Sequence, residues 1–142
     1  MRPLYETQDH LNVETSAKAK LEKAFGVTLN KLPISYNADF AVFKSNELIG
    51  FIEFRRRNML HSKYPTIMLS YKKLLNMISL CSLTGTKSKF VVEFDDGIYY
   101  FDVPFIIDNS WVEFGGRTVQ QRDSADIELI VQIPIENFKR IL

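Results

Sequence analysis

Our prediction of the fold depends most on the segment NADFAVFKSNELIGFIEFR, residues 37–55. Two apolar runs flank the polar cluster KSNE, and this pattern is typical of a β-hairpin. If the loop has three residues, Asp39 lies directly opposite Glu53, with the two Cβ atoms about 5 Å apart. A loop of two residues shifts the register and places the two carboxylates on opposite faces of the hairpin. The length of this turn therefore decides whether the two acids meet.

Asp39, Glu53 and Arg55 form the polar cluster of this hairpin. Arg55 follows Glu53 by two residues, so on a strand both side chains project from the same face. Two neighbouring carboxylates repel each other, and burying either one is costly unless a partner neutralises it. A divalent cation such as Mg²⁺ is a suitable partner. Taken singly, such an Asp is commonly a turn residue and such a Glu commonly faces solvent, but the apolar residues around both acids favour a buried site.

The rest of the chain predicts further helices and strands. Helical spacing of apolar residues predicts helices over residues 5–26 and 66–85. The second helix carries an apolar stripe made of Ile67, Tyr71, Leu74, Leu75, Ile78 and Cys81. The other expected elements are a strand over 27–33, a hairpin over 89–103 that turns at Asp96-Gly97, strands over 110–114 and 127–135, and a short helix over 136–142. This order predicts an α/β sandwich around a central mixed sheet.

Length and composition narrow the class of protein. A chain of 142 residues has the size of one domain. Its formal net charge of +1 provides no overall field that would attract nucleic acid or an anionic membrane, so any basic function must be local. No apolar run approaches the roughly 20 residues of a membrane span, and we expect no membrane association. The single cysteine, Cys81, and the lack of an apolar signal region in residues 1–10 indicate a cytoplasmic location.

The hairpin resembles the signature of the PD-(D/E)XK nuclease superfamily, in which an acid at the start of one strand is followed, after a turn, by acid-any-lysine on the next. Asp39 stands for the first acid, Glu53 for the second, and Arg55 occupies the lysine position. Nearly the whole chain looks like a group of small phage-encoded proteins of this superfamily. That likeness is carried by YET, YNADFAVF, GFIEFRRRN, MLSYKKL, FDDGIYY and, near the end, GGR and RDSADIE. It implies one nuclease-like domain over residues 1–142, located in the host cytoplasm if phage-encoded.

The resemblance implies a fold and a chemistry. The fold is the restriction-endonuclease-like three-layer sandwich, a central mixed β-sheet flanked by helices. The chemistry is hydrolysis of DNA phosphodiester bonds, with Asp39, Glu53 and the backbone carbonyl of Phe54 binding Mg²⁺ (or Mn²⁺). An acid on the first helix often completes the site. Glu14 matches best, and Glu6 and Glu22 are rivals on the same segment. Many nucleases of this superfamily are dimers, so a homodimer is one arrangement that the resemblance implies.

Arg55 departs from the superfamily pattern. Arginine keeps the positive charge of lysine, but its pKa above about 12 means that it cannot accept a proton. Three interpretations stay open. Arg55 acts electrostatically in an active enzyme, Lys73 on the next helix supplies the missing amine, or the site binds metal or nucleic acid without cutting it.

Further cations are candidates for phosphate contact. Arg56 and Arg57, together with Lys63, form a basic segment that either contacts DNA or is an ordinary charged strand end. Arg117 and Arg122 lie in the segment GGRTVQQRD, which is either a loop that reaches the substrate or a Gly-Gly turn with solvated charges.

Overall fold

A computed structural model describes residues 8–33, 38–103, 111–116 and 127–141 of the chain. The first half contains α1 (Gln8–Phe25), β1 (Thr28–Lys31), β2 (Phe40–Lys44), β3 (Glu47–Arg56), β4 (Thr66–Ser70) and α2 (Tyr71–Thr84). The second half contains β5 (Lys87–Phe94), β6 (Gly97–Val103), β7 (Trp111–Gly116), β8 (Ile127–Pro134), a 3₁₀ turn (Ile135–Asn137) and β9 (Lys139–Arg140). Within the described ranges, no helix is both long enough and apolar enough to cross a membrane.

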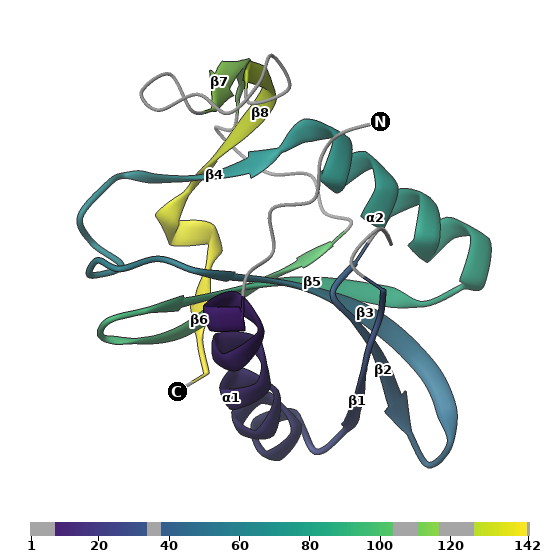
Figure 1. The fold of residues 1–142 in the computed structure, drawn as a ribbon. Helices are drawn as coiled ribbons and strands as arrows, with labels where there is room; N and C mark the ends of the chain where they lie inside the picture. The colour runs from purple at the N-terminus through teal and green to yellow at the C-terminus, as the bar shows by residue number, and fades with distance from the viewer. Residues whose placement is uncertain (1–7, 34–37, 104–110, 117–126, 142) are drawn as a thin grey trace.

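The strands form two sheets. The larger has six strands in the order β1-β2-β3-β5-β6-β9, and the smaller has three in the order β4-β8-β7. The larger sheet is mixed, because β3 and β5 run parallel while its other neighbours run antiparallel. Figure 1 shows α1 on one side of this sheet, and α2 with the smaller sheet on the other. The predicted three-layer sandwich with a central mixed sheet is thereby confirmed.

Each face of the larger sheet buries its own apolar core. On the α1 face, Ala17 and Leu21 of the helix pack over a cluster that includes Leu29, Phe40, Ile52, Phe54 and Val91. On the α2 face, Leu74 and Met77 pack over a cluster that includes Ile67, Leu69, Phe90, Val92, Phe101 and Ile133. Fully burying an apolar side chain of this size contributes about 1.5–3 kcal/mol. The alternation along β3 therefore fixes Ile52 and Phe54 on the α1 face and directs Glu53 toward α2.

The β2–β3 hairpin has the register in which Asp39 lies beside Glu53, but with a two-residue turn and a bulge. Ala41 pairs with Phe51 as expected for a three-residue loop, but Lys44 pairs with Glu47, so the loop has two residues. These are Ser45 and Asn46, whose φ angles of 52° and 65° match the type I′ turn of tight hairpins. Of the two loop lengths considered, the two-residue loop is the one observed, and the inference that it would place Asp39 and Glu53 on opposite faces is wrong. The register shifts between Val42 and Phe43, and this bulge restores the pairing that brings Asp39 to the side of Glu53.

Gly50 stands where β3 meets the start of β5. It pairs with Lys87, and a Cβ atom placed on Gly50 would lie 1.9 Å from the backbone oxygen of Lys87. No side chain fits between these two backbones, so glycine permits the close approach. This contact sets the register of the parallel pair, which continues through Glu53 opposite Phe90 and Arg55 opposite Val92.

The helix predicted over residues 66–85 is wrong in its first part. Residues Thr66–Ser70 form β4, which pairs antiparallel with β8, and α2 begins only at Tyr71. Ile67 and Leu69 alternate with exposed Met68, which is the burial period of a strand. The side chain of Ser70 accepts a hydrogen bond from the Lys73 backbone N–H and caps the helix. Of the expected stripe, Leu75 is exposed, and Met77 is buried in its place.

Two other local expectations are also wrong. The predicted helix over residues 136–142 is absent from the described part of this segment, where a 3₁₀ turn leads into β9. β9 pairs with the edge of β6, and Phe138 is buried in the α2-face core. In the β5–β6 hairpin, Phe94 pairs with Gly97, so the turn residues are Asp95 and Asp96 instead of Asp96-Gly97. The predicted strands over 110–114 and 127–135 correspond to β7 and β8.

Candidate active site

Glu53 lies at the centre of the candidate site. Among the residues that the structure describes it is the one fully buried charged side chain, with 0% exposure. One carboxylate oxygen, Oε2, lies 2.6 Å from Arg55 Nη1 and 2.9 Å from Lys73 Nζ. The other, Oε1, is buried and has no hydrogen-bond partner among the described residues. Burial raises the pKa of this carboxyl above its ordinary value, Arg55 opposes the rise, the negative charge of Asp39 adds to it, and Lys73 opposes it.

Asp39 reaches the same site from the residue before β2. Its Oδ2 accepts a hydrogen bond of 2.7 Å from the backbone N–H of Phe54 and lies 4.0 Å from Arg55 Nη1. Its backbone N–H donates to the Ile52 carbonyl, so the start of the hairpin is held firmly against β3. The second oxygen, Oδ1, lies 3.8 Å from Lys31 Nζ. The two predicted carboxylates are thus brought together on one side of β3.

Arg55 connects the three groups predicted to bind metal. Its Nη1 atom lies 2.6 Å from Glu53 Oε2, donates a 3.0 Å hydrogen bond to the Phe54 carbonyl, and lies 4.0 Å from Asp39 Oδ2. Three oxygen atoms therefore lie around a single cationic nitrogen. A divalent cation bound to these same oxygens would compete with the guanidinium for them.

Lys73 enters the site from the first turn of α2. The Ser70 cap fixes where this helix begins, and one turn of helix then carries the Lys73 side chain over β3. Its Nζ donates a 2.9 Å hydrogen bond to Glu53 Oε2. The sequence interpretation in which Lys73 supplies an amine is therefore geometrically available.

The N-terminal helix approaches the site through Lys31. Lys31 Nζ lies 2.9 Å from Glu14 Oε2 and 3.8 Å from Asp39 Oδ1. Glu22 points elsewhere and accepts a hydrogen bond from the backbone N–H of Leu29, while Glu6 lies outside the described residues. Lys31 was missed by the sequence analysis because only the pairing of β1 with β2, which sets Lys31 opposite Phe40, brings it beside Asp39.

The flanking basic residues have different surroundings. Arg56 forms an ion pair of 2.7 Å with Asp95 and also donates to the Glu93 carbonyl. Burial, and to a lesser extent the charge of Arg55, lowers the pKa of Arg57. Lys63 is exposed and lies over the ring of Tyr64.

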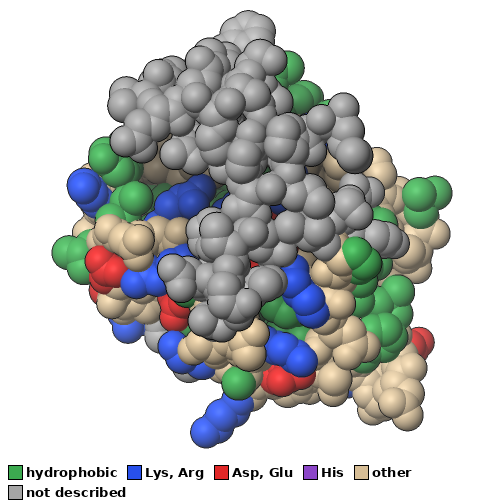
Figure 2. Space-filling view, in the orientation of Figure 1, with side chains coloured by type: hydrophobic (Ala, Val, Ile, Leu, Met, Phe, Trp, Pro, Cys, Tyr) green, Lys and Arg blue, Asp and Glu red, His purple; other side chains and the backbone are tan. Residues whose placement is uncertain are grey.

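Arg117 and Arg122 fall outside the described residues. Figure 2 shows Lys and Arg side chains in several separate places on this face, with acidic side chains beside them. On the described part of this face, the cations therefore lie apart from one another and form no single continuous basic surface.

The oxygen atoms of this site suit a divalent cation that takes only a few ligands from the protein. Within the described ranges, no group of three or more His, Cys, Asp or Glu side chains could hold a metal ion. Mg²⁺ is typically held by only one or two carboxylates and keeps several waters. Two carboxylates, a carbonyl and the unpartnered Glu53 Oε1 are consistent with that kind of site.

Comparisons with known proteins bear on the family and the fold of this chain. A family model described as "Phage putative PDDEXK endonuclease" matches residues 1–141. No curated protein matches the chain. Among solved structures, the Holliday junction resolvase Hjc of Archaeoglobus fulgidus, an archaeal hyperthermophile, is similar with a TM-score of 0.50 and 15% sequence identity. That match covers 64% of this chain and 70% of the resolvase chain, and at this identity it supports the fold alone.

Proposed function

The chain belongs to the family of phage putative PDDEXK endonucleases, and we propose that it is a metal-dependent endonuclease that hydrolyses DNA phosphodiester bonds. Residues 1–142 form one nuclease-like domain in this proposal. The observation that carries it is the convergence of Glu53 Oε2, the Phe54 carbonyl and Asp39 Oδ2 on one cationic nitrogen, at 2.6, 3.0 and 4.0 Å. Oxygen ligands gathered around a positive charge are the arrangement that a nuclease metal site requires.

Asp39, Glu53 and the carbonyl of Phe54 are the proposed ligands of Mg²⁺ or Mn²⁺. When bound, such an ion lowers the pKa of a coordinated water and stabilises negative charge on the phosphate. The hydrogen bond from the Phe54 N–H holds the Asp39 carboxylate in place, and Lys73 holds that of Glu53. Glu14 supports the site through Lys31.

We assign to Arg55 and Lys73 together the roles of the single lysine in the superfamily pattern. Once the Arg55 guanidinium leaves the carboxylates, it can contact the scissile phosphate and stabilise charge there, but it cannot accept a proton. Lys73 Nζ donates to Glu53 and retains further N–H groups that can orient the attacking water.

DNA contact is proposed for the cations around the site. Arg57 and Lys63 are the candidates for phosphate contact on the described loop, with Arg117 and Arg122 on the later segment. Arg56 contributes less directly, because its guanidinium is already paired with Asp95. The described residues form one such site, so we propose a homodimer for cleavage of both strands of a duplex.

The decisive experiment is a cleavage assay with purified protein. Plasmid, duplex and branched DNA are incubated with Mg²⁺ or Mn²⁺, and the unaltered protein is compared with Glu53→Gln and Asp39→Asn. Each substitution should lower the cleavage rate at least about 100-fold, because a metal supplies several kcal/mol of transition-state stabilisation. Lys44→Gln, at the exposed hairpin turn, is the matched control and should cut normally. Equal cleavage by Glu53→Gln would remove Glu53 from the mechanism.

A second candidate function is an inactive nucleic-acid-binding module on the same fold. The contact of Arg55 with all three proposed ligand groups favours it, because a guanidinium that stays there excludes metal. Arg55→Lys separates the two candidates in the same assay. Cleavage that appears only in this variant supports the inactive module, whereas robust cleavage by the unaltered protein rules that module out.

A further inference from the structure

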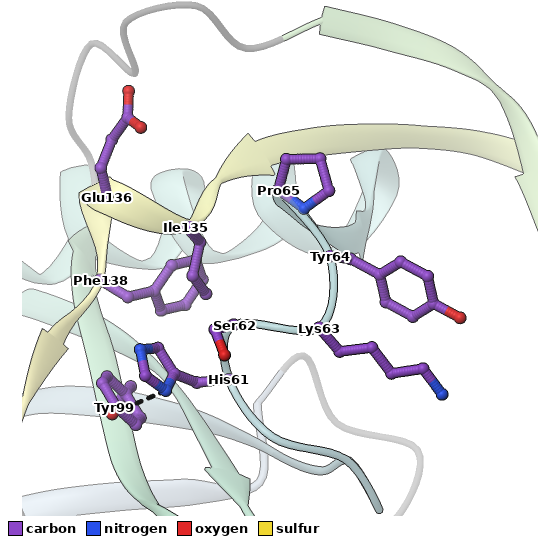
Figure 3. Close-up of a pocket in the computed structure, with 9 residues that line it drawn as sticks. All are labelled: His61, Ser62, Lys63, Tyr64, Pro65, Tyr99, Ile135, Glu136 and Phe138. Atoms are coloured by element: carbon purple, nitrogen blue, oxygen red, sulfur yellow. Dashed lines mark hydrogen bonds between the residues drawn. The ribbon is translucent and has the colours of Figure 1, made fainter.

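A second feature of the molecule lies on the 57–65 loop, which connects β3 to β4. A cavity of about 490 Å³ opens between this loop, β6 and the 3₁₀ turn, and we call it the loop pocket. His61, Lys63 and Tyr64 line it from the loop, and Tyr99 and Phe138 line it from the other side. Figure 3 shows these side chains. None of the residues that line this pocket is a proposed metal ligand.

The loop is fixed to the larger sheet at several points. Asp95 pairs with Arg56 through its carboxylate, and its backbone N–H donates to the Met59 carbonyl. Asp96 accepts a 3.0 Å hydrogen bond from the His61 backbone N–H, and its second oxygen lies 2.6 Å from His61 Nδ1. The two turn acids between β5 and β6 thus hold the loop, so the pocket is formed before any ligand arrives. A pre-formed site binds with less loss of conformational freedom.

The exposed groups of the pocket are aromatic rings and a cation. Tyr64 is 51% exposed, and Lys63 Nζ lies 5.5 Å from the centre of its ring. The His61 ring stacks on Tyr99 with centroids 4.4 Å apart and planes 20° apart. In Figure 3, Lys63 and Tyr64 project from the loop on the same side, and the Glu136 carboxylate points away from both. An aromatic face beside a lysine suits a nucleobase followed by a phosphate.

The pocket shares a face of the larger sheet with the candidate active site. Tyr99 and Phe94 belong to the α2-face core, and the His61 ring contacts both. Arg55 lies opposite Val92, and Asp96, which holds His61, follows Val92 by four residues, so Arg55 and Asp96 are at most about 13 Å apart along the sheet. At about 3.4 Å per nucleotide of one strand, this is roughly four nucleotides of DNA. One bound strand can therefore reach both places.

We propose that the loop pocket binds an unpaired nucleobase of the DNA strand held at the active site, with Tyr64 as its stacking surface and Lys63 contacting an adjacent phosphate. Both faces of a base in a continuous duplex are covered by its neighbours, so only an unpaired base can stack on a side chain. The preferred substrate is then DNA with a single-stranded segment, such as an overhang, a flap or a gap. This inference rests on the proposed function, because it names the substrate class of the same site.

A binding assay without metal tests the pocket separately from hydrolysis. In EDTA, fluorescence anisotropy compares a labelled duplex that carries a single-stranded overhang with a blunt duplex of the same sequence. Tyr64→Ala should weaken binding of the overhang DNA by roughly 5- to 150-fold and leave blunt-duplex binding unchanged, since stacking contributes about 1–3 kcal/mol per base. Tyr64→Phe keeps the ring and should bind within about 2-fold of the unaltered protein. The exposure of Tyr64 means that both variants should fold, which circular dichroism checks.

Each outcome bears on one proposal. Equal binding of both DNAs by the unaltered protein, or an equal loss on both with Tyr64→Ala, overturns the inference even if the protein cuts DNA. A Tyr64-dependent preference for the overhang supports it even if no cleavage occurs, in which case only the proposed hydrolysis fails. Binding of an aromatic peptide with no DNA preference would also overturn it and assign the pocket to a protein partner.

Discussion

Among single residues, Glu53 is an ionisable group whose burial opposes its ionisation. Its carboxylate is fully buried and Oε1 has no hydrogen-bond partner among the described residues, although Arg55 and Lys73 compensate Oε2. Burial outweighs these cations and raises the pKa of Glu53. The folded protein therefore holds this proton more tightly than the unfolded chain does. A buried carboxyl with a perturbed pKa beside specific charged partners is a candidate for a functional site.

The raised pKa of Glu53 predicts a pH-dependent gain in stability for Glu53→Gln. As pH rises from 4.5, the ordinary value, through the raised pKa, the unaltered protein loses stability because ionisation is easier in the unfolded chain. Glutamine removes this loss. In EDTA, the melting temperature of Glu53→Gln should therefore exceed that of the unaltered protein at pH 7, by about 2–4 °C for each kcal/mol, and the gap should narrow toward pH 4. A gap that widens on acidification would contradict this reasoning.

Among the elements, the hairpin has some features that the sequence predicts and others that it does not. The alternation of apolar residues predicted the strands and set Ile52 and Phe54 against the core, and the pairing of Ala41 with Phe51 agrees with it. The register shift between Val42 and Phe43 could not be predicted, because it arises from a compromise between the two-residue turn and the burial of both strands. Similarly, β4 continues the helical spacing of α2 by chance, and only its pairing with β8 makes it a strand. Lys73 was found as a candidate, but its contact with Glu53 depends on the packing of α2 over β3.

Gly50 is a position of the hairpin where a side chain does not fit. The 1.9 Å approach that a Cβ would make to the Lys87 oxygen means that Gly50→Ala must push β3 and β5 apart. This should lower the free energy of unfolding by about 1–3 kcal/mol, measured by urea denaturation. Asn30→Ala, at an exposed position of β1, should stay within about 0.5 kcal/mol of the unaltered protein. If the two substitutions cost the same, the close contact does not constrain the pair of strands.

At the scale of the whole molecule, the candidate site joins parts of the fold that are distant in sequence. Asp39 precedes β2, Glu53 belongs to β3, and Lys73 belongs to α2, so the site spans the larger sheet and the layer above it. A ligand that binds only when these parts are assembled stabilises the entire folded state. The melting temperature is therefore a measure of metal binding that needs no DNA and no cleavage.

Metal-linked stability predicts an order among three proteins. At a Mn²⁺ concentration about 100 times the dissociation constant, binding stabilises the folded chain by about 2.7 kcal/mol, which corresponds to a rise of roughly 5–10 °C in melting temperature. Glu53→Gln should lose this rise, because one of the two carboxylates is gone. Arg55→Gln should show a larger rise than the unaltered protein at the same Mn²⁺ concentration, because the guanidinium no longer competes for Glu53, the Phe54 carbonyl and Asp39. A smaller rise in Arg55→Gln would mean that Arg55 and the metal bind together instead of excluding each other, and an undiminished rise in Glu53→Gln would place the metal elsewhere.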